Sequence, residues 1–268
     1  MQSEPRRTPD GFNQFTAKLL AEMESVEGYL APNEIRFLAL LAACPTAVGE
    51  ILEIGSFKGK STIILAKSAA LADGARVNAV DPMTAPCETD PTLGNQESSL
   101  GDFKRNVATA GVEDRVRLHQ MFSKELASGW NGPLRLLWID GDHTYAGTKL
   151  DFDGFAPHLV DKSIVAIHDT LHEFEGGARV FLESVLRSPN FGACGFCGSI
   201  AWAQFHLDPK DAERHASKKR ALAARVERLL PYLGRGELGG LTKKMYKIAR
   251  WRIPHGAVDP DEWLASVD

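Results

Sequence analysis

The segment that most constrains this chain is Ile51–Thr62, where an apolar run passes into a glycine-punctuated turn and then into a helix start. Gly55 and Gly59 allow a positive φ or the close approach of a ligand to the backbone. Ser61 and Thr62 follow, where free N–H groups of a first helical turn can face an anion. The pattern predicts a strand, a nucleotide-binding loop and a helix in direct succession.

The spacing of the glycines argues against two familiar nucleotide motifs. A phosphate-binding loop needs four residues before its Gly-Lys-Ser, but Gly55 and Gly59 enclose only three. A dinucleotide fingerprint needs glycine where Phe57 stands. The remaining pattern, Glu-x-Gly-x-x-x-Gly, resembles the first motif of class I S-adenosylmethionine-dependent methyltransferases. The resemblance implies that this stretch binds the cofactor through Glu53, Gly55, Ser56, Gly59, Ser61 and Thr62.

Further strands follow in the order that this resemblance requires. Arg76–Asp81 reads as a second strand, and its final acid stands where a Rossmann-like sheet holds its ribose-binding carboxylate. Ser123 follows the third strand, where such proteins line the adenine pocket. Leu134–Asp140 and Ser163–Asp169 read as buried parallel strands, and ligands bind at the carboxyl ends of such strands. By the resemblance, Asp140 also borders the cofactor.

Two polar motifs narrow the resemblance. Asp140-Gly141-Asp142-His143 and His168-Asp169-Thr170 together resemble the divalent-metal-dependent O-methyltransferases of the catechol and caffeoyl-CoA type. They resemble more closely the macrocin, mycinamicin and novobiocin sugar methyltransferases, over residues 48–205. The resemblance implies that the metal is held by Asp140, His168 and Asp169.

His168 departs from these relatives, which carry a carboxylate, or a carboxylate and an amide, at this pair. Mg²⁺ prefers oxygen ligands, whereas imidazole suits Mn²⁺, Fe²⁺ or Zn²⁺ better. Either the metal differs from Mg²⁺, or His168 lies behind the ligands.

The chemistry implied is methyl transfer to a hydroxyl whose pKa a divalent metal lowers. His143 stands where catechol-type relatives carry a catalytic lysine, and Asp142 where a sugar methyltransferase carries its base. Imidazole has the better matched pKa, which favours His143 over Asp142 as the base. The predicted reaction is methylation of a hydroxyl on a sugar or saccharide-bearing metabolite, with S-adenosylmethionine as donor and Mg²⁺ or Mn²⁺ as metal.

Three alternatives stay open. The first is a phenol or catechol-type O-methyltransferase. The second is a nucleotide-dependent phosphotransferase built on Gly59-Lys60-Ser61, against which the short loop counts. The third is a non-catalytic module with the same fold. Separately, acids at strand ends often cap the next helix, and a lone histidine is often part of the core.

Composition sets the remaining expectations. With 268 residues, 44% of them hydrophobic, the chain can bury one large core. The net charge of −4 argues against binding to nucleic acid or to an anionic membrane, and no segment has the length of a membrane span. The N-terminus lacks the apolar core of a signal peptide, so a cytoplasmic location is expected. The expected partner is a small-molecule or oligosaccharide acceptor, with a homodimer as a further expectation.

Periodicity gives the layout, which is an α/β fold with a doubly wound, mostly parallel sheet. The resemblance implies seven strands with an antiparallel last strand. Within one compact domain we expect an N-terminal helical cap (1–47), a cofactor-binding catalytic part (48–206) and a basic helical C-terminal extension (207–268). Helices are expected within 11–43 and at 60–72, 99–110, 145–156 and 176–187, and closing strands near 190–196 and 199–206.

Two local features need separate interpretation. Residues 82–98 are rich in proline and polar groups, which suggests a lid over the substrate. Cys194 and Cys197 lack the further ligands of a zinc site and the context of a redox pair, so a tight turn between strands is expected there.

Overall fold

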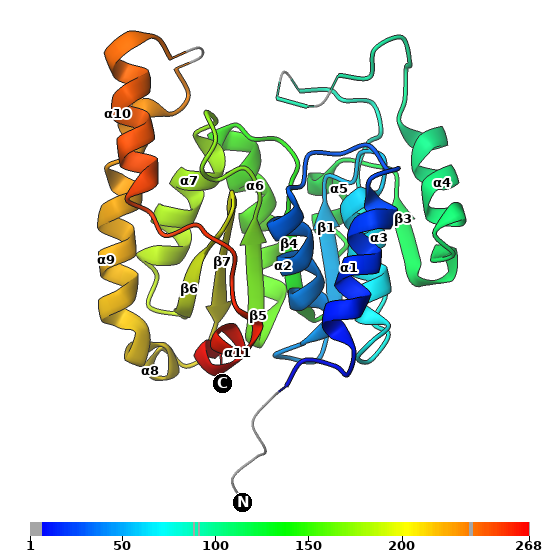
Figure 1. The fold of residues 1–268 in the computed structure, drawn as a ribbon, viewed down its shortest axis with the longest axis horizontal. Helices are drawn as coiled ribbons and strands as arrows, with labels where there is room; N and C mark the ends of the chain where they lie inside the picture. The colour runs from blue at the N-terminus through cyan, green and yellow to red at the C-terminus, as the bar shows by residue number, and fades with distance from the viewer. Residues whose placement is uncertain (1–6, 88, 91, 236–237, 268) are drawn as a thin grey trace, which may run out of the picture.

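The computed structural model describes residues 7–87, 89–90, 92–235 and 238–267. Residues 1–6, which the signal-peptide prediction concerns, lie outside this part of the chain, as do residues 88 and 91 of the predicted lid. In the described part a seven-stranded sheet has the order β3-β2-β1-β4-β5-β7-β6 (Figure 1). Its strands are β1 (Glu50–Ile54), β2 (Val77–Val80), β3 (Val116–His119), β4 (Leu134–Ile139), β5 (Leu159–Ile167), β6 (Phe191–Cys197) and β7 (Ile200–Phe205).

The directions of the strands confirm the predicted fold class. Strands β1 to β5 pair in parallel, while β7 runs antiparallel to both β5 and β6. The carboxyl ends of β1, β2, β4 and β5 therefore meet at one edge of the sheet. Ligands bind at this edge in open α/β sheets.

The central strands are apolar because helices cover both faces of the sheet. Alternate residues of a strand point to opposite faces. Ile51 accordingly belongs to a core cluster with α1, α2 and α3, whereas Leu52 belongs to a second cluster with α6, α7 and α9. All six residues of β4 are buried, as expected for a strand with both faces covered.

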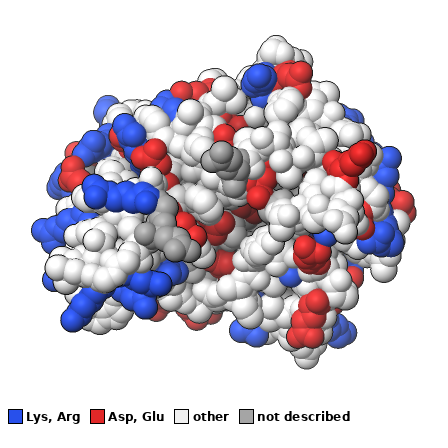
Figure 2. Space-filling model, turned by 90° about the horizontal axis from the view of Figure 1, so that it is seen from above, with Lys and Arg blue, Asp and Glu red and all other residues white. Residues whose placement is uncertain are grey.

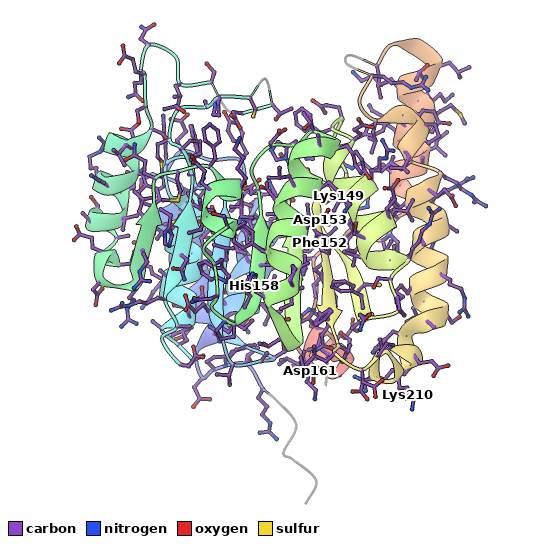
Figure 3. The ribbon with its side chains drawn as sticks, turned by 180° about the vertical axis from the view of Figure 1, so that it is seen from behind. Lys149, Phe152, Asp153, His158, Asp161 and Lys210 are labelled. Atoms are coloured by element: carbon purple, nitrogen blue, oxygen red, sulfur yellow. The ribbon has the colours of Figure 1, made fainter. Side chains whose placement is uncertain are left out.

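The helices agree with the predicted ranges to within a few residues. The observed helices are α1 (Phe12–Met23), α2 (Pro32–Ala43), α3 (Lys60–Ala69), α4 (Leu100–Thr109), α5 (Ser123–Ala127), α6 (Tyr145–Phe155), α7 (Gly176–Val180), α8 (Pro209–Ala212), α9 (Ala216–Glu227), α10 (Gly240–Trp251) and α11 (Pro260–Val267). The helix expected at 176–187 divides into α7 and a π-helical segment, η3 (Phe181–Leu186). Figure 3 shows the layer of α6 from behind, where Lys149 and Asp153 form an ion pair at the surface.

The C-terminal part packs against the rest of the molecule through α11, a helix that the sequence reasoning did not anticipate. Trp263 of α11 lies edge-on to Phe37 of α2 and to Trp202 of β7. Gln204 Nε2 donates to the carbonyl oxygen of Val267. Within the described residues, no helix has the length and apolar character needed to cross a membrane.

The turn expected at the cysteine pair lies directly after it. Cys194 and Cys197 both lie in β6, and the turn follows at Gly198, whose φ is +60°. Burial raises the pKa of the Cys194 thiol to about 12 and that of Cys197 to about 11. Both side chains therefore stay protonated near neutral pH and behave as small apolar groups.

Candidate active site

A cleft of about 560 Å³ lies at the carboxyl edge of the sheet. Seen from above this edge, the surface is hollowed at its centre, with Asp and Glu around the hollow and Lys and Arg at the periphery, most densely on the left (Figure 2). The connection between β2 and α4 borders the cleft through Cys87, Thr89 and Asp90. The predicted lid thus lies where it could cover a bound substrate.

The glycine loop forms one end of the cleft. Gly55 has a φ of +84°, and a Cβ there would lie 2.2 Å from the carbonyl oxygen of Asp140. Gly59 has a φ of +88° and directly precedes the first turn of α3. Both positions require glycine because a left-handed backbone is combined with close packing. The sequence pattern therefore identified this turn correctly, because both glycines have the positive φ that was expected of them.

Asp81 is fixed by this loop. Its Oδ2 accepts hydrogen bonds of 2.8 Å from the backbone N–H groups of Ser56 and Phe57, and its Oδ1 accepts one from Met83 N. The carboxylate lies at the end of β2 and lines the cleft. A negative group is thus held in position at the place where the sequence predicted a ribose-binding acid.

Glu53 lies beneath the loop and is fully buried. Its Oε2 accepts hydrogen bonds from Ser56 Oγ and Thr62 Oγ1. Burial raises the pKa of Glu53 to about 7, and the nearby charge of Asp140 acts in the same direction, against the lowering effect of hydrogen bonds from neighbouring hydroxyls. Glu53 supports the loop from below and does not line the cleft.

The residues predicted to bind the cofactor divide into two groups. Those that line the cleft are Gly55, Ser56, Ser61, Asp81, Ser123 and Asp140. The other three, which lie outside the lining of the cleft, are Glu53 and Thr62 below the loop and Gly59 within it.

Ser123 begins α5 at the far side of the cleft, and its Oγ donates to Asp151 of α6. Burial raises the pKa of Asp151 to about 7, although the bond from Ser123 opposes this. Asp151 also lines the cleft, and the sequence reasoning missed it because an acid within an amphipathic helix carries no distinguishing pattern.

Two carboxylates and an imidazole meet in the middle of the cleft. Asp140 and Asp169 follow the neighbouring strands β4 and β5, and each can offer a ligand atom within 4.8 Å of one from His143. His143 Nε2 lies 3.7 Å from Asp169 Oδ2. The imidazole stacks on the ring of Phe174, with 5.1 Å between centroids. Such a set of ligands on one side of an open cleft can hold a divalent cation.

His168 lies behind this cluster. Its Nδ1 is 2.9 Å from Asp140 Oδ1, and its Nε2 is 3.5 Å from Glu34 Oε2. Burial opposes the charged imidazolium, but the Asp140 carboxylate and the contact with Glu34 prevail and raise the pKa of His168 well above its ordinary value. Both ring nitrogens of His168 are thus directed at carboxylates of the protein, and the ligand set predicted from the sequence stays a prediction.

Glu34 was not singled out from the sequence. It lies in the first turn of α2, where it accepts hydrogen bonds from Ala31 N and from both Ser199 N and Ser199 Oγ. Burial opposes its charge, but the bonds from His168, Ser199 and Ala31 prevail and lower the pKa of Glu34 to about 2. An acid in a first helical turn is ordinary in sequence, so only the fold reveals this contact.

Asp142 has a structural role alongside any chemical one. Its Oδ1 accepts a hydrogen bond of 2.8 Å from Thr144 N and lies 3.4 Å from Thr89 Oγ1. Thr144 in turn caps α6 by accepting from Gly147 N. The side chain of Asp142 lines the cleft, so it shapes the turn and also faces the space where a substrate would lie.

Residues 52–170 match the model of a methyltransferase domain. The matched range contains the glycine loop, Asp81 and the three residues that could hold a metal ion, which are Asp140, His143 and Asp169. The matched sequence range and the strand order therefore agree: residues 52–170 are similar to a methyltransferase domain, which is the catalytic unit of a transferase.

Three solved structures show the same fold. Cofactor-bound Rv0187 from MTB is 18% identical, with a TM-score of 0.54, and the match covers 76% of this chain and 100% of that one. The O-methyltransferase from Bacillus cereus in complex with SAH is 19% identical, covering 76% and 93%, with a TM-score of 0.51. The O-methyltransferase TomG from Streptomyces achromogenes, involved in tomaymycin synthesis and solved with SAM, is 17% identical, covering 76% and 92%, with a TM-score of 0.52. The fold is the Rossmann-like methyltransferase fold.

Proposed function

We propose that this protein transfers a methyl group from S-adenosylmethionine to a hydroxyl oxygen of an acceptor held beside a divalent metal ion. The observation that carries the proposal is the convergence of Asp140, His143 and Asp169 in the cleft that also contains the glycine loop. A donor site and a cation site in one cleft are what a metal-dependent methyl transfer requires.

The shape of the cleft suggests how the donor would lie. Asp81 offers a carboxylate to the ribose hydroxyls, and charge-assisted hydrogen bonds of this kind are strong. Ser61, in the first turn of α3, lies near free backbone N–H groups that suit the methionyl carboxylate. Ser123 and Asp151, at the far side, would accept the adenine end. Asp140 would then face the sulfonium.

The donor set of the cluster fits a divalent ion. It offers two carboxylates and one imidazole, a combination suited to Mn²⁺, Fe²⁺ or Zn²⁺ as well as Mg²⁺. We propose His143 as the third ligand in place of His168. His168 holds Asp140 from behind through Nδ1, and such outer hydrogen bonds orient ligating carboxylates. A bound ion would lower the pKa of the acceptor hydroxyl.

If His143 binds the metal ion, it is not free to act as the base. We therefore propose that Asp142 removes the proton of the acceptor hydroxyl. Its carboxylate lies on the wall of the cleft, and its contacts with Thr144 and Thr89 fix its orientation. The leaving group becomes a neutral thioether, so a general acid is not needed. This reverses the preference for His143 as base that imidazole chemistry alone gave.

A sugar or saccharide-bearing metabolite is the acceptor that the cleft suits best. Neighbouring hydroxyls of a sugar could approach a metal together, while the stacked ring of Phe174 offers a flat wall for a ring face. Thr89, Asp90 and Lys124 supply polar groups around the opening. A phenolic acceptor is the second candidate, favoured by the same Phe174 surface.

Thermal unfolding with added ligands tests the proposal. S-adenosylhomocysteine should raise the Tm with or without metal, and Mn²⁺ should raise it for the wild-type protein. Asp169→Asn should lose the Mn²⁺ effect but keep that of S-adenosylhomocysteine, since the cluster is separate from Asp81. Asp114→Asn, an exposed acid in a turn before β3, is the matched control and should behave as wild type. Full methyltransferase activity in excess EDTA would refute the metal part of the proposal.

A further inference from the structure

Helix α10 exposes an unusual amount of apolar surface. Four of the ten exposed large hydrophobic residues in the described part of the chain belong to this one helix: Leu241 (75% exposed), Met245 (42%), Ile248 (38%) and Trp251 (80%). Leu241, Met245 and Ile248 follow one another at helical spacing, so they form a continuous stripe on one side. Single exposed hydrophobic residues are common, but a stripe of this kind marks an interaction surface.

The same helix is strongly basic. Lys243, Lys244 and Lys247 are all exposed, and the sequence contains no acid between Leu238 and Val258. Over residues 208–255 there are thirteen Lys and Arg against five Asp and Glu, although the whole chain has a net charge of −4. Figure 2 shows cations gathered on the side of the molecule where α9 and α10 lie in Figure 1.

The C-terminal end of α10 is firmly attached to the domain. Ala249 and Ile253 are buried in the core cluster of α6 and α9. Tyr246 Oη donates a hydrogen bond of 2.7 Å to the carbonyl oxygen of Leu171, which precedes the cleft residue Phe174. The helix therefore presents its exposed apolar and basic surface to solvent in a fixed orientation.

We propose that α10 docks this protein on an anionic lipid bilayer. A helix that carries tryptophan, an aliphatic stripe and lysines on its solvent side has the composition of an interfacial helix. Its cations complement anionic headgroups, and its length and exposed lysines suit a position on the membrane surface. The net charge of −4 had suggested that the protein does not contact an anionic membrane, but this value for the whole chain conceals the excess of Lys and Arg over residues 208–255.

A second copy of the chain fits the surface less well. A two-fold interface centred on α10 would place this helix against its own image, so that its unbalanced lysines would face the same lysines. Like charges at that distance repel, and the helix carries no acid to offset them. The proposal is independent of the chemistry in the cleft.

Co-sedimentation with vesicles tests the proposal on the full chain. The protein should sediment with vesicles of equal parts phosphatidylcholine and phosphatidylglycerol, remain in solution with phosphatidylcholine alone, and release from the anionic vesicles as salt is added. Replacing Lys243 and Lys247 by Gln should weaken binding about 25-fold, because each lysine near an anionic surface contributes a factor of about five. The matched control carries Lys18→Gln and Lys104→Gln, exposed lysines of α1 and α4, and should bind as wild type.

Two results would overturn the proposal. One is equal binding to both kinds of vesicle, or to neither. The other is a dimer in sedimentation velocity that Trp251→Ser converts to monomer, together with no lipid binding, since this would mean that a second copy covers the stripe. An unchanged Tm in each variant verifies that the fold is intact, and it is the expected result because the substituted side chains are exposed.

Discussion

Replacing Glu53 by Gln should change how stability depends on pH. The folded state raises the pKa of this buried carboxyl from 4.5 to about 7, chiefly through burial. As the pH rises above 4.5, Glu53 ionises in the unfolded chain while the folded protein keeps its proton, so unfolding becomes more favourable. One pKa unit corresponds to about 1.4 kcal/mol, so the raised pKa costs the folded state about 3 kcal/mol once the pH exceeds both values.

Urea unfolding of the wild-type and Glu53→Gln proteins measures this effect. The amide keeps one oxygen acceptor for Ser56 and Thr62 and removes the buried charge. Its stability relative to wild type should therefore rise by about 2.5 kcal/mol between about pH 5 and about pH 8. Glu113→Gln, an exposed carboxyl before β3, is the control and should change stability little at either pH. A difference between variant and wild type that is constant with pH would refute the assignment of an uncharged Glu53.

Three further predictions concern the cleft. Gly55→Ala should lower the unfolding free energy by at least about 2 kcal/mol in urea titrations, since its Cβ would meet a backbone carbonyl, whereas Gly111→Ala, with a positive φ but open space, should cost about 1 kcal/mol. Asp142→Asn should lower kcat by about 10²- to 10⁴-fold and leave the metal affinity unchanged, whereas His143→Ala should weaken metal binding. If His143→Ala instead causes the larger loss of kcat with metal affinity retained, then His143 is the base and Asp142 is not. Asp81→Ala should weaken S-adenosylmethionine binding by about 1–3 kcal/mol in calorimetry, and an unchanged affinity would remove it from the cofactor site.

The sheet and the glycine loop were predictable because their causes are local. Ile51, Leu52 and Ile54 are apolar and point to both faces of the sheet, which identifies a strand covered on both sides, and glycine is favoured where a positive φ is combined with close packing, as at Gly55. The acids at the ends of β2, β4 and β5 could be placed together for the same reason, since parallel strands end at one edge.

The surroundings of His168 were not predictable, because they depend on contacts between distant parts of the chain. Glu34 of α2 reaches His168 only after the N-terminal helices have packed against the sheet. That contact and the one to Asp140 together engage both ring nitrogens of His168. Helix α11 was missed for a related reason, since its short apolar run gains meaning only against Phe37 and Trp202.

The contact between Glu34 and Ser199 joins residues 165 positions apart. A ribosome releases α2 long before it releases β7, and contacts of such wide separation form late in folding. In a growing chain, β1 to β4 and Asp140 would thus be in place before Ser199 could donate its backbone N–H and hydroxyl hydrogen bonds to the carboxylate of Glu34. The cleft would therefore be able to bind its ligands only after β6 and β7 have formed. A nascent or truncated chain would have the walls of the cleft but would lack the hydrogen bonds that stabilise the charge of Glu34.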